Sequence, residues 1–158
     1  MTLDSNKFLD EVGWKLLLEL QSDARLSFAE LGRRVGLSLP AVAERVRRME
    51  EAGLITGYHA HINLPQVGLP LTAFIRIMTT SDRYPAVITL VKKLPAVLEC
   101  HHLTGTDSFI VKVVAASIPD LEALITQLSV FGQTATSIVL SSPVTRRVVG
   151  PNHGDSGS

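Results

Sequence analysis

Three arginines in one short stretch are the residues in this sequence whose type and spacing most clearly indicate chemistry. Arg45, Arg47 and Arg48 lie in "GLSLPAVAERVRRMEEAGLI", residues 36–55. Guanidinium groups pair with phosphates and with guanine edges, so a helix that presents them on one side could bind a nucleic acid. Solvent-exposed helices also carry arginine and glutamate together in ion pairs worth less than about 1 kcal/mol each. The helix face alone leaves both interpretations open.

A helical wheel at about 100° per residue divides this stretch into two sides. Val42, Val46 and Met49 share one narrow sector and are predicted to face a core. The opposite side carries Pro40, Ala41, Glu44, Arg47, Arg48 and Glu51, with Arg45 on the flank. Small residues at the start would let that end enter a groove of DNA, and arginines further along could reach phosphates or bases. The predicted DNA-contacting residues are Arg33, Arg34, Ser38, Pro40, Ala41, Glu44, Arg45, Arg47 and Arg48.

The distribution of charge separates the two interpretations. The chain of 158 residues has a formal net charge of zero, which excludes binding by bulk positive charge but permits a local basic face. Residues 25–48 contain six arginines against two glutamates, whereas residues 1–24 contain two lysines against five acidic side chains. Positive charge is therefore concentrated where the arginines lie, and this favours DNA binding.

A second candidate site is the segment "LTGTDS", which comprises Leu103, Thr104, Gly105, Thr106, Asp107 and Ser108. The glycine lets backbone amides approach a carboxylate, the hydroxyls add donors, and Asp107 could bind an ammonium group. An α-amino acid presents both of these poles to its binding site. A plain hairpin turn favours the same residue types, and the residues by themselves favour the turn.

The run "ECHH" at residues 99–102 raises the question of a metal site. Alternation along a strand sends Cys100 and His102 to one face and Glu99 and His101 to the other, so these side chains should not converge on one ion. No nucleophile motif accompanies the histidines either. We therefore expect no metal, no cofactor and no catalytic centre. A dimeric ferredoxin-like enzyme is the competing class, but it would leave the arginine-bearing helices unexplained.

The elements that must position the arginines follow helical spacing over residues 9–52. Apolar residues from Leu9 to Leu20 recur at intervals of three and four, which predicts a first helix. Ser27, followed three residues later by a glutamate, predicts the start of a second helix that Gly36 ends. Ser38 is predicted to cap a third helix that Gly53 ends. Three helices with a tight glycine turn between the last two form a helix-turn-helix.

Two glycines fall inside these predicted helices. Gly32 removes a side chain where crossing helices must approach closely. Gly13 interrupts the first helix, where a glycine costs roughly 1 kcal/mol relative to alanine.

From residue 71 onward, short β-branched runs alternate with two helical segments. The predicted strands are 71–79, 97–103, 108–115 and 135–148, and the predicted helices are 84–94 and 119–130. This order is βαββαβ, the ferredoxin-like arrangement with two helices on one face of an antiparallel sheet. The other face would be open and partly apolar, which predicts a homodimer.

The two halves together predict an α+β protein with a connector between them. Residues 55–62 are expected to form a short strand, and "NLPQVGLP" has the proline and glycine content of a linker. The predicted parts are a helix-turn-helix domain at 1–57, strand and connector at 58–70, an effector-binding and dimerisation domain at 71–149, and a disordered tail at 150–158.

The cellular compartment can be predicted from the number of cysteines and from the hydropathy of the chain. Cys100 is the single cysteine and cannot form an internal disulfide, which favours a reducing compartment. Met1 begins no signal-like segment, and the richest apolar run, residues 109–116, is far shorter than the roughly 20 residues that span a bilayer. A cytoplasmic protein without a membrane partner is expected.

These segments together resemble the Lrp/AsnC (feast/famine) family of transcriptional regulators. The resemblance covers about Leu9 to Val148, and its most specific parts are "RLSFAELGRRVGLS" and "VAERVRRMEEAGLITGY", with "LTGTDSFIVKV" and "TATSIVL" further along. It implies DNA binding modulated by an amino acid or related metabolite, and dimers that assemble into tetramers or octamers. An architectural DNA-binding protein without a metabolite response is the alternative.

The sequence departs from the family pattern at two places. Gly13 stands where the first helix usually has an aspartate. In the later turn the family often shows glycine, two residues, then aspartate and tyrosine, whereas here the carboxylate of Asp107 comes one residue earlier. If Phe109 sets the strand register, Ser108 occupies the usual aspartate position and Asp107 points to the other side. Either residue could therefore meet a ligand.

Overall fold

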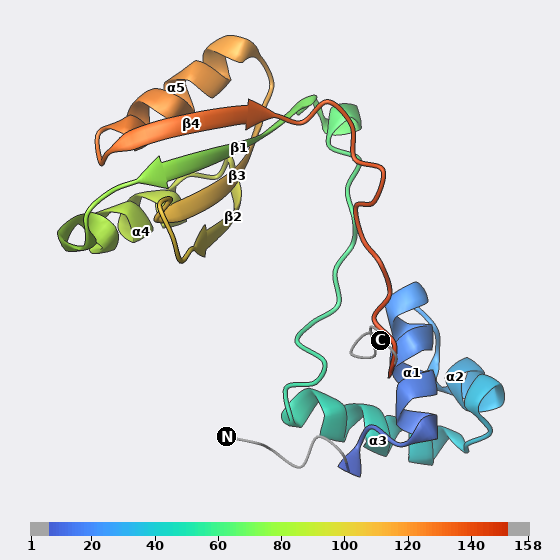
Figure 1. The fold of residues 1–158 in the computed structure, drawn as a ribbon. Coiled ribbons are helices and arrows are strands. Elements are labelled where there is room, and N and C mark those ends of the chain that lie inside the picture. The colour runs from blue at the N-terminus through green and yellow to red at the C-terminus, as the bar shows by residue number, and fades with distance from the viewer. Residues whose placement is uncertain (1–6, 152–158) are drawn as a thin grey trace, which may run out of the picture. The chain divides into compact units, whose positions relative to one another are not determined.

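The computed structural model describes residues 7–151, which divide into two compact units (Figure 1). One unit contains the described residues up to Ala60 together with those from Val144 onward, and the other is His61–Pro143. Within the described residues, no helix is long and apolar enough to cross a membrane.

The first unit is built from three helices, α1 (Glu11–Ser22), α2 (Phe28–Val35) and α3 (Leu39–Glu51). Its core joins all three through Leu16, Leu20, Leu31, Val42 and Val46. Met49 is also buried, so the residues that the wheel placed inward are all inside. The prediction of a helix-turn-helix is confirmed.

Local sequence explains where these helices begin and end. The side chains of Asp10, Ser27 and Ser38 each accept a hydrogen bond from the backbone amide three residues later, at 2.7, 3.1 and 3.4 Å. Each bond satisfies one of the amides that a helix start leaves unpaired. Gly36 ends α2 with a left-handed φ of 76°, which glycine adopts without steric cost. The predicted caps are confirmed, and Asp10 is a cap that the apolar pattern did not reveal.

Both interior glycines lie against backbone carbonyls. A Cβ on Gly32 would lie 2.4 Å from the carbonyl oxygen of Leu37 in the turn before α3, which confirms the predicted close approach. A Cβ on Gly13 would lie 1.8 Å from the carbonyl oxygen of Phe8. Gly13 is therefore required by packing at the start of α1, and its low helix propensity is the lesser effect.

The end of the described chain lies against α1. The side-chain amide of Gln21 donates to the carbonyl of Val149 at 2.9 Å and accepts from its backbone N–H at 3.0 Å. Arg146 Nη2 donates to the Gln21 carbonyl at 3.3 Å. We call residues 144–150 the C-terminal strap, which Figure 1 shows running beside α1.

The last predicted strand is too long, because the sequence predicts one strand over residues 135–148, whereas residues 139–148 form no strand. The strap instead belongs to the helical unit, and a Cβ on Gly150 would be 3.6 Å from Leu18 Cδ2, an ordinary packing distance. Residues 152–158, the rest of the predicted tail, lie outside the described residues.

The second unit is a four-stranded antiparallel sheet with two helices, in the predicted βαββαβ order. The strands are β1 (Leu71–Met78), β2 (Val97–His102), β3 (Phe109–Ala115) and β4 (Gln133–Ile138), and the sheet order is β2-β3-β1-β4. The helices are α4 (Tyr84–Lys93) and α5 (Ile118–Ser129). Their apolar residues pack with alternate residues of β1 and β3 in one core, so both helices cover the same face of the sheet.

Two strand predictions are wrong at particular places. Residues 55–62 form no strand, and the connector contains only a short 3-10 helix at Pro65–Val67. All described strands belong to the sheet of the other unit, so the unit that contains residues 55–60 has no strand of its own with which they could pair. β4 stops at Ile138, which pairs with Ala73 of β1, and beyond this pair the Val139 amide donates to the Thr72 carbonyl at 2.8 Å.

The sheet face opposite the helices carries mixed side chains. One row across the strands is Glu99, Lys112, Phe74 and Ser137, and the next is His101, Ile110, Arg76 and Ala135. Lys112 Nζ donates to Glu99 Oε1 at 2.9 Å. Neither helix of this unit covers these rows, which leaves the face available to another surface.

Candidate nucleic-acid interface and ligand loop

Glu44 lies at the centre of the outward side of α3 and binds Arg47 and Arg48. Its carboxylate accepts from Arg47 Nε and Nη2, each at 2.9 Å, and from Arg48 Nε at 2.7 Å. Hydrogen bonds from Arg47 and then from Arg48 lower the pKa of Glu44 to about 2. Arg47 also binds Glu51 one turn later, and the hydrogen bond with Glu44 is the main cause of its raised pKa. The outward face of α3 is therefore a linked network of charges.

A similar network on α2 surrounds Glu30. Its carboxylate accepts from Arg33 at 2.6 and 2.8 Å and from Arg34 Nε at 2.8 Å, and these bonds lower its pKa to about 2. Arg34 Nη1 also donates to Glu19 of α1 at 2.6 Å. The side chain of Arg33 is 73% exposed and that of Arg34 is 39% exposed. Arg34 thus holds α2 to α1, while Arg33 is the more accessible of the two predicted contacts.

Arg45 has a structural role that its place on the wheel did not show. Its two terminal nitrogens donate to the two carboxylate oxygens of Asp10 at 2.8 and 2.9 Å. Asp10 also caps α1 through the amide of Gly13, and the bond from Arg45, followed by this cap bond, lowers its pKa. Arg45 therefore ties α3 to the start of α1, and the fork of its guanidinium faces α1.

The N-terminal end of α3 presents small and exposed groups. Ser38 and Pro40 are exposed and Ala41 is partly exposed, as expected for an end that enters a groove. The Ser38 hydroxyl is occupied by its capping bond to the Ala41 amide. Leu39 is 52% exposed beside them, although it is a large apolar residue. On a wheel at about 100° per residue Leu39 falls beside Val46 on the apolar side, so the periodic pattern predicts burial and gives no signal of its exposure.

The loop between β2 and β3 is closed at its base by backbone bonds. The Leu103 amide donates to the Ser108 carbonyl at 2.9 Å, and Thr104 and Thr106 are exposed. Gly105 has a φ of 103°, which side chains rarely adopt, and nothing lies within 4 Å of where its Cβ would be. The loop therefore has the backbone geometry of a tight turn with an open glycine.

Asp107 and Ser108 are neighbours with different environments. Ser108 is only 6% exposed, and its hydroxyl donates to the Thr79 carbonyl at 2.9 Å and accepts from the Thr79 amide at 3.2 Å. Its own amide donates to the Ile77 carbonyl at 2.8 Å. Asp107 is half-buried, and its carboxylate has no hydrogen bond or ion pair with any described residue. Ser108 fastens the loop to the end of β1, whereas the Asp107 carboxylate is available.

Three rings lie at the base of this loop. The ring of His102 stacks on Phe109 with centroids 4.8 Å apart and an interplanar angle of 27°. Tyr84, the first residue of α4, meets both rings edge-on, at 4.7 Å from His102 and 5.2 Å from Phe109. Tyr84 and His102 were not among the predicted site residues, because only the fold brings α4 to the end of β2.

The side chains of "ECHH" alternate as predicted. Glu99 binds His101 at 3.2 Å and Lys112 at 2.9 Å on the open face of the sheet, whereas Cys100 packs against the core, where burial raises the pKa of its thiol. Over residues 7–151, no three His, Cys, Asp or Glu side chains gather closely enough to hold a metal ion.

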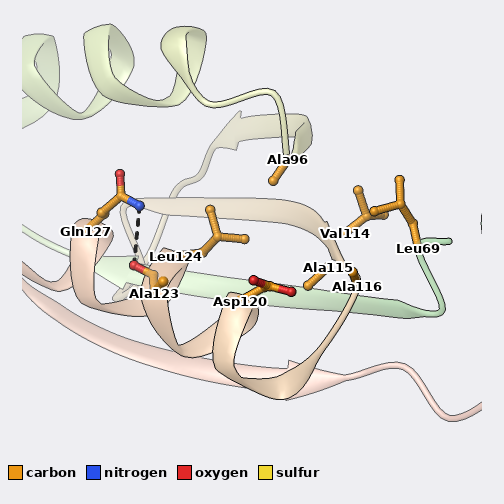
Figure 2. A pocket seen from close by; sticks show the side chains of 9 residues that line it. All are labelled: Leu69, Ala96, Val114, Ala115, Ala116, Asp120, Ala123, Leu124 and Gln127. Carbon is orange, nitrogen blue, oxygen red and sulfur yellow. Dashed lines mark hydrogen bonds between the residues drawn. The ribbon is translucent and has the colours of Figure 1, made fainter.

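A shallow hollow of about 310 Å³ lies at the other end of β3 (Figure 2). It is lined mainly by apolar residues, namely Leu69 before β1, Ala96 before β2, Val114, Ala115 and Ala116 at the end of β3, and Ala123 and Leu124 on α5, with Asp120 and Gln127 of α5 as its polar members. Gln127 donates to the Ala123 carbonyl at 3.4 Å, the bond drawn in Figure 2. None of the predicted loop residues 103–108 lines this hollow.

Comparisons with known proteins agree with this division into two units. Residues 9–50 match the AsnC-type helix-turn-helix domain, and residues 72–149 match the Lrp/AsnC ligand binding domain. The HTH-type transcriptional regulator YezC of Bacillus subtilis (strain 168) is 40% identical over 134 residues, which cover 85% of this chain and 95% of YezC.

Solved structures of regulators have the same fold. The structure of LrpC from Bacillus subtilis matches with a TM-score of 0.83 and 31% identity, over 87% of this chain and 99% of that one. A transcriptional regulator from Neisseria meningitidis, solved as a complex with L-Met, matches with a TM-score of 0.85 and 30% identity, over 92% of this chain and 98% of that one. YezC and LrpC are both named HTH-type transcriptional regulators, and the Neisseria meningitidis protein is named a transcriptional regulator, so these relatives are regulators rather than enzymes. The chain therefore belongs to the Lrp/AsnC family of transcriptional regulators.

Proposed function

We propose that α3 enters the major groove of double-stranded DNA and that an amino acid, bound at residues 103–108, changes the strength of this binding. The observation that carries the DNA-binding part is the outward side of α3, where an exposed small-residue end is followed by exposed arginines. A helix of this kind can lie in the major groove while its arginines reach phosphates or base edges. Such a regulator acts in the cytoplasm.

The structure narrows the set of predicted contacts. Arg33, Arg47 and Arg48 are exposed, so their side chains are accessible to DNA. Arg45 binds Asp10, the cap of α1, and Arg34 binds Glu19 of α1, so in this proposal they hold the helices in place. Ser38, Pro40 and Ala41 form the end that approaches the groove.

Asp107 is the residue that we assign to the ammonium group of the effector. Its carboxylate is available, while the hydroxyl of Ser108 is occupied on both sides by the backbone of Thr79. The open backbone at Gly105 would serve the carboxylate of the same ligand. The complex of the Neisseria meningitidis relative with L-Met supports an amino acid as the chemical class.

The open face of the sheet is the surface that we propose for a homodimer. It carries Phe74 and Ile110 among polar residues, and neither helix of the unit covers it. Two copies would place two α3 helices on half-sites separated by whole turns of DNA, so operators should be (pseudo)palindromic. Sedimentation velocity should show a dimer or a larger even assembly, such as a tetramer or octamer. A monomer at micromolar concentration would remove this part of the proposal.

One experiment tests the regulatory function as a whole. Fragments selected from random duplex DNA by the wild-type protein are titrated with protein, with and without each of the common amino acids, L-Met included. We expect one or a few amino acids to change the apparent Kd, because a ligand shifts an equilibrium by its differential affinity for the two states. Isothermal titration calorimetry should show the same ligands binding to wild type and not to Asp107→Ala. If no amino acid or related metabolite changes DNA affinity or assembly, the protein is an architectural DNA-binding protein.

A further inference from the structure

The arginines of α3 are held by Glu44 in unequal ways. In Arg47, Nε and Nη2 bind Glu44 and Nη1 binds Glu51, so each of its three nitrogens has a carboxylate partner. Arg48 is bound through Nε alone. Its two terminal nitrogens have no hydrogen-bond partner within residues 7–151. Glu44 and Glu51 thus occupy all three nitrogens of Arg47, whereas Glu44 leaves the two terminal nitrogens of Arg48 available.

The available edge of Arg48 has the geometry that reads guanine. Guanine presents O6 and N7 as two acceptors in the major groove, and the two terminal nitrogens of a guanidinium bind them as a pair. An arginine free to rotate would lose side-chain entropy on forming this pair. Arg48 is fixed at Nε by Glu44 before DNA arrives, so less entropy is left to lose.

The negative charge of Glu44 favours guanine recognition by Arg48 but weakens the contacts of α3 with DNA phosphates. Phosphate contacts supply most of the affinity for DNA of any sequence. Arginines without carboxylate partners would bind phosphates regardless of the base sequence. A carboxylate at the centre of the outward face competes with phosphate for both Arg47 and Arg48, and it repels the phosphate itself. Glu44 should therefore weaken binding to unselected sequences.

We propose that Glu44 is a specificity-determining positioning residue, which aims Arg48 at a guanine edge and lowers the affinity of α3 for phosphates. This inference rests on the proposed binding of α3 to DNA and adds which base pair is read and by which pair of residues. Glu51 provides a matched control. It lies on the same face and binds Arg47, but it is not bonded to Arg48.

The test is a selection of bound sequences from a pool of random duplex DNA. It compares wild type with Glu44→Gln, Glu51→Gln and Arg48→Lys, and the Kd for the unselected pool is measured for each protein. We expect wild type to enrich a motif with one strongly preferred G·C pair in each half-site. In Glu44→Gln the preference for that pair should fall by about tenfold, the size of one bidentate base contact, and the pool should bind more tightly.

The control variants separate the positioning of Arg48 from the effect of removing a negative charge. Glu51→Gln should also bind the pool more tightly, because it removes the same charge, but its motif should be that of wild type. Arg48→Lys should lose preference at the same base pair as Glu44→Gln, because lysine keeps the charge and lacks the fork. All of these side chains are at least partly exposed, and thermal unfolding of each variant checks that the fold is retained.

Three results would overturn the inference. An unchanged motif in Glu44→Gln would make Glu44 an ordinary surface ion pair. Equal loss of preference in Glu44→Gln and Glu51→Gln would make charge alone responsible. Loss at different base pairs in Glu44→Gln and Arg48→Lys would separate the two residues. A wild-type protein that enriches no sequence would instead contradict the proposed sequence-specific binding itself, so the two failures are distinguishable.

Discussion

Arg45 and Asp10 lie 35 positions apart in the chain and form a two-fold hydrogen-bonded ion pair, with N···O distances of 2.8 and 2.9 Å. The same carboxylate caps α1 by accepting from the Gly13 amide at 2.7 Å. One side chain therefore sets both the start of α1 and the position of α3 against it. Since α3 carries the proposed DNA contacts, this pair orients the interface without belonging to it.

Replacing Asp10 should destabilise the helical unit through two separable contributions, the lost helix cap and the lost ion pair. Asp10→Ala removes the cap and the ion pair, and we expect it to lower the free energy of unfolding by about 1 kcal/mol, the usual cost of a lost cap. Asp10→Asn keeps a cap acceptor and should cost less, because partly exposed ion pairs contribute little. Chemical denaturation monitored by circular dichroism measures both. Equal losses in the two variants would assign the effect to the ion pair.

The pH dependence of stability should show the carboxylates that arginines hold. Glu30 and Glu44 have pKa values of about 2 in the folded protein against 4.5 normally, and the pKa of Asp10 is also lowered. A group whose pKa is lowered by folding stabilises the protein above its unfolded pKa, and this contribution is lost as pH falls through the folded pKa. Stability should therefore decrease from about pH 4.5 toward about pH 2. Thermal unfolding across this range checks it, and Glu30→Gln with Glu44→Gln should flatten the decrease.

Gly13→Ala should destabilise the protein, although alanine is the better helix former. In an open helix interior the change would gain roughly 1 kcal/mol. Here the new Cβ would meet the Phe8 carbonyl oxygen at 1.8 Å, so the start of α1 must move. Overpacking of this kind costs about 1–3 kcal/mol, and we expect a lower Tm in differential scanning calorimetry. A raised Tm would show that residue 8 moves aside without cost.

Gln21→Ala should release the C-terminal strap from α1. The variant loses both bonds between the Gln21 side chain and the backbone of Val149, whose amide should then exchange its hydrogen faster. Hydrogen exchange followed by NMR measures this at the Val149 amide. Ser22→Ala is the control, because the Ser22 hydroxyl binds only the Leu18 carbonyl in the preceding turn. Equal exchange rates in wild type and Gln21→Ala would mean that other contacts hold the strap.

Ser108→Ala should lower the stability of the protein, whereas Asp107→Ala should leave it nearly unchanged. Removing the Ser108 hydroxyl leaves the amide and the carbonyl of Thr79 without their partner, which costs about 1–3 kcal/mol of stability when the groups are buried. Asp107→Ala removes no bond to a described residue, so we expect its stability within about 0.5 kcal/mol of wild type. Urea denaturation measures both. A large loss in Asp107→Ala would show that this carboxylate supports the fold.

Much of the fold could be predicted because its signals are local. The starts of α2 and α3, the end of α2 at Gly36 and the inward side of α3 depend on bonds and periodicity within a few residues. The βαββαβ order likewise follows from the pattern of short strands and helices along the chain. Burial of Val42, Val46 and Met49 confirms that spacing alone was enough to orient α3.

The candidate site could be predicted only as a set of residues. Arg33, Arg47 and Arg48 are on the exposed side as expected, but the sequence could not divide the arginines between DNA and the protein's own carboxylates. Arg34 binds Glu19 of α1, 15 positions away, and Arg45 binds Asp10, the cap of α1, 35 positions away. The environment of Ser108 likewise depends on Thr79, which follows β1 and is 29 positions from Ser108.

The sequence by itself determined the three helices of the first unit, the βαββαβ order of the second, the caps at Ser27 and Ser38 and the side of α3 that carries arginines, because each of these depends on neighbours within about one helical turn or on strand alternation. Only the tertiary structure decided which arginines are held by α1, why α1 contains Gly13, where β4 ends and where the strap lies. The bonds between Gln21 and Val149 join residues 128 positions apart. Such contacts depend on which backbone groups meet after folding, and no local pattern encodes them.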